Sequence, residues 1–146
     1  ANNVLDVLGR FLNMGVEAYQ FVSALNCVLA QRLVRMICAH CKRQIRVSRQ
    51  LLEESGLDPA LEHTQAFYEG VGCIECNGTG YKGRVGLYEV MEISEGIRDL
   101  VMVGATAVEI KRKALEEGML TLRMSGLEKI KAGVTSIEEV LRETVL

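Results

Sequence analysis

The sequence predicts a mostly helical α+β protein that carries a cysteine-bounded insert and ends in a small bundle of four helices. Of its 146 residues, 49% are hydrophobic and only one is proline, a composition typical of a globular protein rather than a disordered one. Apolar residues recur at helical spacing near the N-terminus and again after residue 94. Between these regions, two C-x-x-C pairs lie between two segments that are predicted to be strands.

The first segment, residues 1–36, is predicted to contain two helices and a strand. The first helix ends at Gly15, and the apolar residues that predict it are Val4, Leu5, Leu8, Phe11 and Leu12. The second helix is short, and its apolar or aromatic residues are Tyr19, Phe21, Val22 and Leu25. Residues 28–34 fit either a helix or a strand. We predict a strand, because β-branched residues and the first cysteine pair follow at once.

The insert, residues 37–80, is predicted to hold one short helix and one short strand. Ser48 is a suitable N-cap for a helix that ends near Gly56. Residues 58–71 have no clear period, so we expect a loop with one short strand. Residues 84–91 alternate between apolar and polar side chains, which predicts a second long strand. We expect this strand to pair antiparallel with residues 28–35 and so to bracket the insert.

The tail, residues 81–146, continues from that strand into four predicted helices. Ser94 begins the first, which runs to about Met102, and a capping box at residues 106–109 begins the second, which ends at Gly118. The third ends at Gly133, and a second capping box at 135–138, with Thr135 as its N-cap, begins the fourth. The residues expected on the buried faces of the last three helices are Ile110, Ala114, Leu115, Leu120, Met124, Leu127, Ile130, Ile137, Val140 and Leu141.

Four of the five cysteines form the pairs Cys38 with Cys41 and Cys73 with Cys76, and 31 residues separate the pairs. Each C-x-x-C turn places two sulfurs about one tetrahedral edge apart, so two turns supply the four thiolates of a closed structural zinc site. The long gap distinguishes the site from a minimal zinc ribbon and leaves room for the short helix. We expect zinc to stabilise the insert, because the insert has few large apolar residues with which to fold alone.

The cysteine pattern has other interpretations. The four thiolates suit iron as well as zinc, and they could instead form two disulfides or a redox pair. The sequence has no secretion signal, which favours a reducing compartment and therefore a metal. His40 lies between two predicted ligands, but four cysteines complete the site without it. Cys27 is predicted to be a buried small hydrophobe, and His63 has no partner that the sequence identifies.

The glycines of residues 78–83 fit the G-x-G-x-x-G spelling of a nucleotide-phosphate loop. Such a loop needs a strand before it and a helix after it, whereas here a cysteine precedes it and a predicted strand follows. No G-x-x-x-x-G-K-[ST] motif occurs in the sequence. We therefore predict that these glycines form a turn that directs backbone amides toward the cysteine sulfurs. Lys42, Arg43 and Lys82 are close enough in sequence to offset the −2 charge of a four-thiolate zinc site, or else they are ordinary surface residues.

Net charge and hydropathy exclude two classes of partner. The formal net charge is −2, and the basic residues between positions 32 and 49 are interspersed with apolar ones, so no nucleic-acid groove is expected. No stretch approaches the roughly 20 apolar residues of a membrane span. The N-terminus has neither an initiator methionine nor the features of a signal peptide, and we expect the chain to be a fragment of a longer protein.

Several motifs occur in an order that is specific to one family. They are residues 14–17 (MGVE), 29–35 (LAQRLVR), 38–41 (CAHC), 72–84 (GCIECNGTGYKGR) and 86–89 (GLYE), followed by Gly118-Met119 and the predicted helix at 133–141. Over nearly its full length the chain resembles the C-terminal region of the type II secretion and type IV pilus-assembly ATPases. The first three residues resemble the stretch that follows the histidine box of that family.

The resemblance implies that the parent is a cytoplasmic hexamer that hydrolyses ATP with Mg²⁺ at the inner membrane and acts on platform or secretion-complex proteins. This chain would carry the end of the RecA-like P-loop ATPase domain (1–36), the zinc subdomain (37–80) and the returning strand with the helical tail (81–146). The catalytic motifs of the family are upstream of it, so we expect no catalytic residue, no bound nucleotide and no ATPase activity in the chain itself.

Three arginines and one alternative function class remain to be considered. Arg32, Arg35 and Arg84 match basic positions of the family, and we expect surface or structural roles for them rather than contact with nucleotide or a neighbouring subunit. The competing function class is a free-standing zinc module that binds nucleic acid or polypeptide. The acidic net charge and the long helical tail argue against that class.

Overall fold

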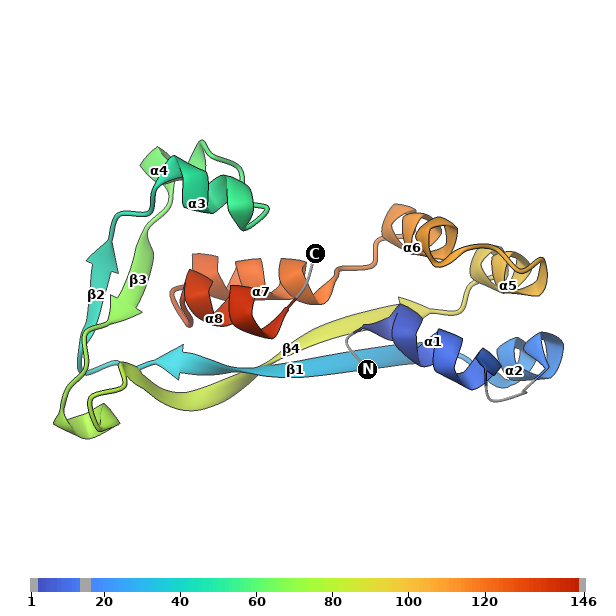
Figure 1. Cartoon of the computed structure of the whole chain (residues 1–146), viewed down its shortest axis with the longest axis horizontal. Helices are drawn as coiled ribbons and strands as arrows, with labels where there is room; N and C mark the ends of the chain where they lie inside the picture. The colour runs from blue at the N-terminus through green and yellow to red at the C-terminus, as the bar shows by residue number, and fades with distance from the viewer. Residues whose placement is uncertain (1–2, 14–16, 145–146) are drawn as a thin grey trace. The chain divides into compact units, whose positions relative to one another are not determined.

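A computed structural model describes residues 3–13 and 17–144 and confirms the α+β class (Figure 1). The elements are α1 (Val4–Asn13), α2 (Ala18–Ala24), β1 (Cys27–Ile37), β2 (Lys42–Ile45), α3 (Arg49–Glu54), α4 (Leu61–Thr64), β3 (Phe67–Gly70), the 3₁₀ helix η1 (Ile74–Cys76), β4 (Tyr81–Glu92), α5 (Glu95–Met102), α6 (Ala107–Glu116), α7 (Leu122–Lys131) and α8 (Ile137–Glu143). Gly15, the predicted end of the first helix, lies outside the described residues, as do Met14 and Val16 of the MGVE motif.

The two long strands were predicted from sequence and are confirmed. β1 and β4 are hydrogen-bonded neighbours in a two-stranded sheet, and their arrows point in opposite directions in Figure 1. Both strands are longer than predicted, and β4 begins directly after the glycine-rich turn. A second two-stranded sheet pairs β2 antiparallel with β3. None of the helices in the described part of the chain has the length and apolarity that crossing a bilayer requires.

The chain divides into two compact units, each made from two separate stretches. Unit 1 comprises residues 1–31 and 88–122, and unit 2 comprises residues 32–87 and 123–146. All four predicted tail helices are present, but α5 and α6 belong to unit 1 whereas α7, from Arg123 onward, and α8 belong to unit 2. This division of the tail differs from the single four-helix bundle that the sequence predicts.

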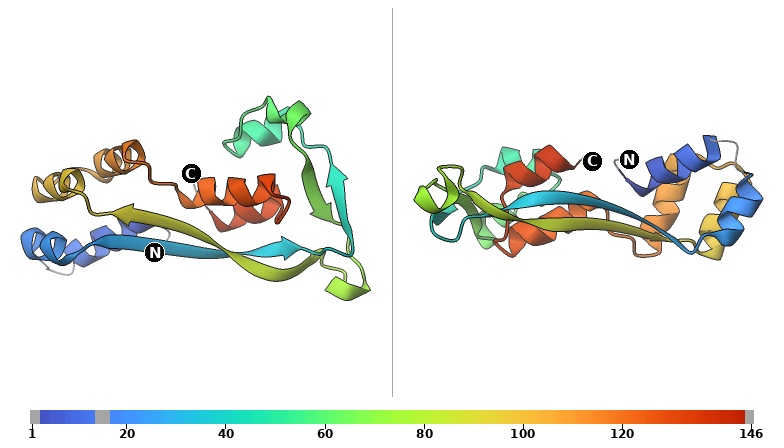
Figure 2. Two further views of the ribbon diagram at one scale, coloured as in Figure 1. Left: turned by 180° about the vertical axis from the view of Figure 1, so that it is seen from behind. Right: turned by 90° about the horizontal axis from the view of Figure 1, so that it is seen from below.

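In unit 1, α5 packs against α2 and α6 (Figure 2). The predicted caps of these helices are confirmed, because the Ser94 hydroxyl accepts from the Ile97 amide at the start of α5 and the Thr106 hydroxyl accepts from the Glu109 amide at the start of α6. A buried carboxylate, that of Glu89 on β4, accepts hydrogen bonds from two backbone amides of this unit.

In unit 2, the β2–β3 hairpin leads into α3 and α4, whose region shares a core with α7 and α8. The buried members of this core are Val47, Leu52, Leu57, Phe67, Ile130, Ile137 and Val140. Ser48 caps α3 as predicted, since its hydroxyl accepts from the Leu51 amide at 3.2 Å. Neither β2 nor α4 was predicted as a separate element.

Three local predictions in the tail are corrected. Leu120 precedes α7 and is exposed, and Met124 is also exposed, whereas Leu122, Arg123 and Ile130 of α7 are buried. The N-cap of α8 is Ser136, whose hydroxyl accepts from the Glu139 amide at 3.2 Å, while the Thr135 hydroxyl donates to the Arg35 carbonyl at 2.7 Å. The N-cap of this helix is therefore shifted by one residue, and the Glu139 carboxylate bonds Arg35 and Arg142 rather than completing a capping box.

Candidate metal centre

Two strand pairings bring the four predicted cysteine ligands together in unit 2. Just beyond the paired ends of β1 and β4, the Cys38 amide donates to the Gly80 carbonyl at 2.9 Å. Just beyond the paired ends of β2 and β3, the Val71 amide donates to the Cys41 carbonyl at 3.2 Å. The turn that carries η1 lies where these four strand ends meet (Figure 1). The hairpin thus closes the long gap in the sequence between the two C-x-x-C pairs.

The sulfurs of Cys38, Cys41, Cys73 and Cys76 all lie within 4.8 Å of one another. The Sγ–Sγ distance is 3.8 Å for Cys38 to Cys73 and for Cys41 to Cys76, and 3.7 Å for Cys73 to Cys76. A tetrahedron of sulfurs with Zn–S bonds of 2.3 Å has edges of about 3.8 Å. All four thiols are free in this structure, so the cluster can hold a metal ion and is not arranged as two disulfides.

Backbone amides point at two of the sulfurs. The Gly72 amide donates to Cys41 Sγ at 3.3 Å, and the amides of Cys73 and Gly80 each donate to Cys76 Sγ at 3.2 Å. Such donors stabilise the thiolate form that a metal requires and orient the ligand. Of the glycines at 78–83, Gly80 directs its amide toward a sulfur as predicted, whereas the Gly78 amide donates to the Cys73 carbonyl.

The same surroundings separate the acidities of two thiols. Burial raises the pKa of the Cys41 thiol to about 11, although the Gly72 amide acts in the opposite direction. Burial also raises the pKa of Cys76, but the amides of Cys73 and Gly80 together outweigh it and hold that pKa at about 6. Of these two thiols, Cys76 is therefore the one whose thiolate form the surrounding amides favour.

The backbones of Gly70 and Gly80 approach each other so closely that neither position has room for a side chain. A Cβ atom at Gly70 would lie 1.9 Å from the Gly80 carbonyl oxygen, and one at Gly80 would lie 2.4 Å from the Gly70 carbonyl oxygen. Gly80 also has φ of +81°. The glycine-rich turn that the sequence predicts includes Gly80 but not Gly70. The position of Gly70 three residues before Cys73 was the only available signal.

We expect Gly80→Ala to lower the free energy of unfolding by about 3 kcal/mol, because it adds a backbone collision to an unfavourable φ. Gly78→Ala is the matched control, since Gly78 has φ of +78° but nothing within 4 Å of a Cβ, and should cost only about 1 kcal/mol. Urea denaturation of the zinc-loaded chain measures both. Equal losses would contradict the close approach.

The predicted neighbouring cations have partners of their own. Arg43 pairs with Glu69 at 2.6 Å, as their opposed positions on β2 and β3 require. Lys82 lies 3.7 Å from Glu75, and Lys42 lies over an aromatic ring. All three residues are exposed and paired, in agreement with the expectation that they are ordinary surface residues.

Other singled-out residues lie away from the cluster or outside its ligand set. His40 is exposed and is not among the grouped ligands, and the His63 side chain is 82% exposed. Cys27 is exposed, so the prediction that it is buried was wrong, because its side chain is on the open face of β1. Arg84 is exposed, whereas Arg35 is bonded to the carboxylate of Glu139. Arg35 thus has a structural contact, as expected.

Within the described residues, the four cysteines are the only group of three or more potential metal-ligating side chains.

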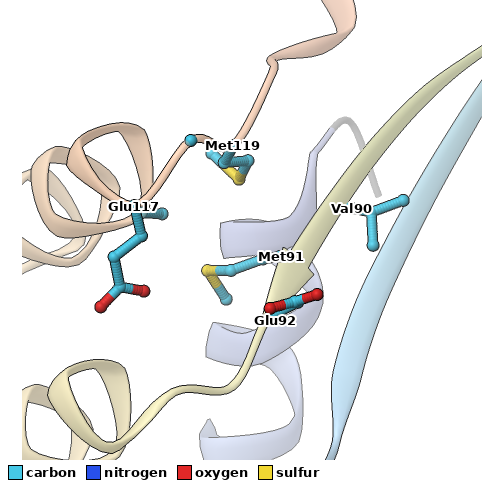
Figure 3. A pocket seen from close by; sticks show the side chains of 7 residues that line it. Val90, Met91, Glu92, Glu117 and Met119 are labelled. Atoms are coloured by element: carbon cyan, nitrogen blue, oxygen red, sulfur yellow. The ribbon is translucent and has the colours of Figure 1, made fainter.

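Unit 1 has a pocket of about 240 Å³ between the end of β4 and the end of α6. Figure 3 shows Met91 and Met119 directing their side chains into this space. Glu117 at its rim accepts from the Ser94 hydroxyl, so this carboxylate serves the start of α5.

The arrangement of the cluster suits a structural metal rather than a catalytic one. Four sulfurs complete a tetrahedral site and leave no position for water or substrate. The glycine-rich turn lies between η1 and β4, so no helix N-terminus follows it to bind phosphate.

Comparison with known proteins places this site in a family context. Residues 1–142 match the family described as type II/IV secretion system protein. The chain is 44% identical over 98% of its length to the type IV pilus assembly ATPase PilB of Myxococcus xanthus, and 41% identical over 99% to PilB of Thermus thermophilus. It is 36% identical over 98% to type II secretion system protein E of Dickeya dadantii.

The chain corresponds to only part of each relative. It covers 25% of the Myxococcus protein, 16% of the Thermus protein and 28% of the Dickeya protein. The motifs that suggested the resemblance and the match over nearly the whole chain agree. The chain belongs to the type II/IV secretion system protein family.

Proposed function

We propose that this chain is the C-terminal zinc-binding module of a hexameric ATPase that powers type II secretion or type IV pilus assembly. The observation that carries the proposal is the cluster of four sulfurs within 4.8 Å, found in a chain whose relatives are named as pilus assembly ATPases and secretion proteins. The metal ligands are Cys38, Cys41, Cys73 and Cys76.

Zinc is the metal that we assign to the cluster. It favours four thiolates in tetrahedral geometry and supplies stability rather than redox chemistry. The metal fastens the β2–β3 hairpin to the ends of β1 and β4, because each strand pair contributes to the four ligands. Iron bound by the same cysteines would give a coloured protein, so metal analysis and colour separate the two.

ATP hydrolysis belongs to the part of the parent that precedes this chain. We assign residues 1–36 to the end of a RecA-like domain, residues 37–80 to the zinc subdomain and residues 81–146 to the returning strand and the helical tail. The module couples the motor to platform or secretion-complex proteins at the cytoplasmic face of the inner membrane. Family membership and the net charge of −2 favour this role over a free-standing module that binds nucleic acid.

The test uses the full-length protein in a bacterium that makes pili or secretes through this system. Cys76→Ser should abolish assembly or secretion while the purified protein retains its sites for ATP, since those lie upstream. Cys27→Ser, at an exposed cysteine outside the cluster, should have no effect. Normal assembly by Cys76→Ser would overturn the proposal.

A further inference from the structure

The first turn of α8 is bonded to both chain segments that enter the cysteine cluster, and all of these contacts lie within unit 2. One segment is the end of β1, which leads into Cys38. The other is the start of β4, which follows the turn that carries Cys76. The bonds on each side involve side chains whose partners the sequence alone did not reveal.

On the β1 side, the carboxylate of Glu139 binds Arg35 through both side chain and backbone. Arg35 Nε and Nη2 donate to Glu139 Oε1 at 3.0 and 2.7 Å, and the Arg35 amide donates to Oε2 at 2.8 Å. Two residues further on, the Ile37 amide donates to the Val134 carbonyl at 2.9 Å. Cys38 is the next residue, so the position of its backbone depends on these bonds.

On the β4 side, Tyr81 contacts both Arg35 of β1 and Ser136 at the start of α8. The Arg35 guanidinium lies over its ring, 4.2 Å from the centroid, which is a cation–π contact. Its hydroxyl lies 2.5 Å from the hydroxyl of Ser136, the N-cap of α8. Tyr81 follows Gly80, whose amide donates to Cys76 Sγ. Tyr81 and Gly80 thus connect α8 to Cys76 of the second cysteine pair.

Glu139 is the centre of this arrangement. Its side chain is only 2% exposed, and it also pairs with Arg142 one turn further along α8. Burial raises the pKa of the Glu139 carboxyl, but the bonds from Arg35 outweigh this effect and hold its pKa below the usual range. A buried carboxylate of this kind depends on its partner, because removal of Arg35 leaves the charge desolvated and only partly compensated.

We propose that metal binding at the cysteine cluster and docking of α8 are energetically coupled through Arg35, Tyr81 and Glu139. The inference rests on the proposed metal site and adds to it the route by which the tail and the zinc subdomain influence each other. Coupling of this kind is reciprocal, so zinc strengthens the docking of α8 by the same factor by which docking strengthens zinc binding. Loss of the Arg35–Glu139 pair, which weakens docking, should therefore weaken zinc binding.

The test measures zinc affinity of the whole 146-residue chain by competition with a chelator. We expect Arg35→Ala to weaken zinc binding about tenfold, within the range of ordinary site-to-site coupling. Arg43→Ala is the matched control. Arg43 makes the same two-nitrogen contact with one carboxylate oxygen of Glu69 and is closer in sequence to a cysteine ligand, but it does not contact α8. It should change the affinity less than about twofold.

A second readout follows the helix itself. Hydrogen exchange of the Val140 amide should slow when zinc is added to the wild-type chain, and Glu139→Gln should remove most of that difference. Glu139→Gln also serves for the affinity measurement if Arg35→Ala does not fold. If the wild-type chain binds no zinc, the metal site itself is wrong. If it binds zinc and Arg35→Ala and Arg43→Ala bind it equally well, the metal site stands and the coupling is wrong.

Discussion

Replacing Cys38 or Cys76 with serine should unfold the region between the two cysteine pairs. Both side chains are buried, and each comes from a different C-x-x-C pair. Structural zinc stabilises small metal-binding domains by on the order of 10 kcal/mol, and three sulfurs do not complete its preferred site. We therefore expect loss of bound zinc and loss of amide protection in β2 and β3, measured by metal analysis and hydrogen exchange.

Cys27→Ser is the control for this experiment. Cys27 is exposed and is not among the grouped ligands, so its replacement should change the free energy of unfolding by less than about 0.5 kcal/mol. Retained zinc and native protection in the Cys38→Ser chain would show that the metal does not hold this region together.

Glu89→Ala should lower the free energy of unfolding by about 3 kcal/mol, because it leaves two buried backbone amides without an acceptor. Glu89 is 4% exposed; its Oε2 accepts from the Val4 amide at 2.8 Å and its Oε1 from the Leu122 amide at 3.2 Å. Val4 is the first residue of α1, where a carboxylate also interacts favourably with the helix dipole. Urea denaturation gives the loss, and faster exchange of these two amides gives its location.

Glu92→Ala separates this effect from the loss of a charge on β4. Glu92 is exposed on the same strand, and its replacement should fall within about 0.5 kcal/mol of wild type. Glu89→Gln should be intermediate, because it keeps one oxygen acceptor and turns a donor toward the other amide. Comparable losses for Glu89→Ala and Glu92→Ala would contradict the role of the buried carboxylate.

The elements that sequence predicted correctly are those in which one local signal is strong. Ser48, Ser94 and Thr106 precede apolar helical patterns, and each caps a helix in the structure. The four cysteines were identified as one site because C-x-x-C spacing fixes the distance between sulfurs before any tertiary structure is known. The strand at 84–91 was predicted from the alternation of apolar and polar residues, and the strand at 28–34 from the β-branched residues and the cysteine pair that follow it.

The features that were missed depend on contacts far apart in the sequence. β2 is polar and mostly exposed, so it lacks the alternation that indicates a strand and is defined by its pairing with β3. Arg123 occupies a buried position on α7 because carbonyls of Ser55 and Thr144 and the Thr144 hydroxyl accept from it. The sequence carried no signal for a role of Glu139, because only the fold places Arg35 beside it.

The visible absorption spectrum of the cobalt-substituted chain is the most direct test of the four-cysteine site. One equivalent of Co²⁺ per chain should give intense bands of tetrahedral cobalt with thiolate charge transfer, and one equivalent of zinc should remove them. The bands should weaken and shift in Cys76→Ser and remain unchanged in Cys27→Ser. A spectrum of octahedral cobalt in the wild-type chain, or one that is the same in Cys76→Ser, would contradict the account.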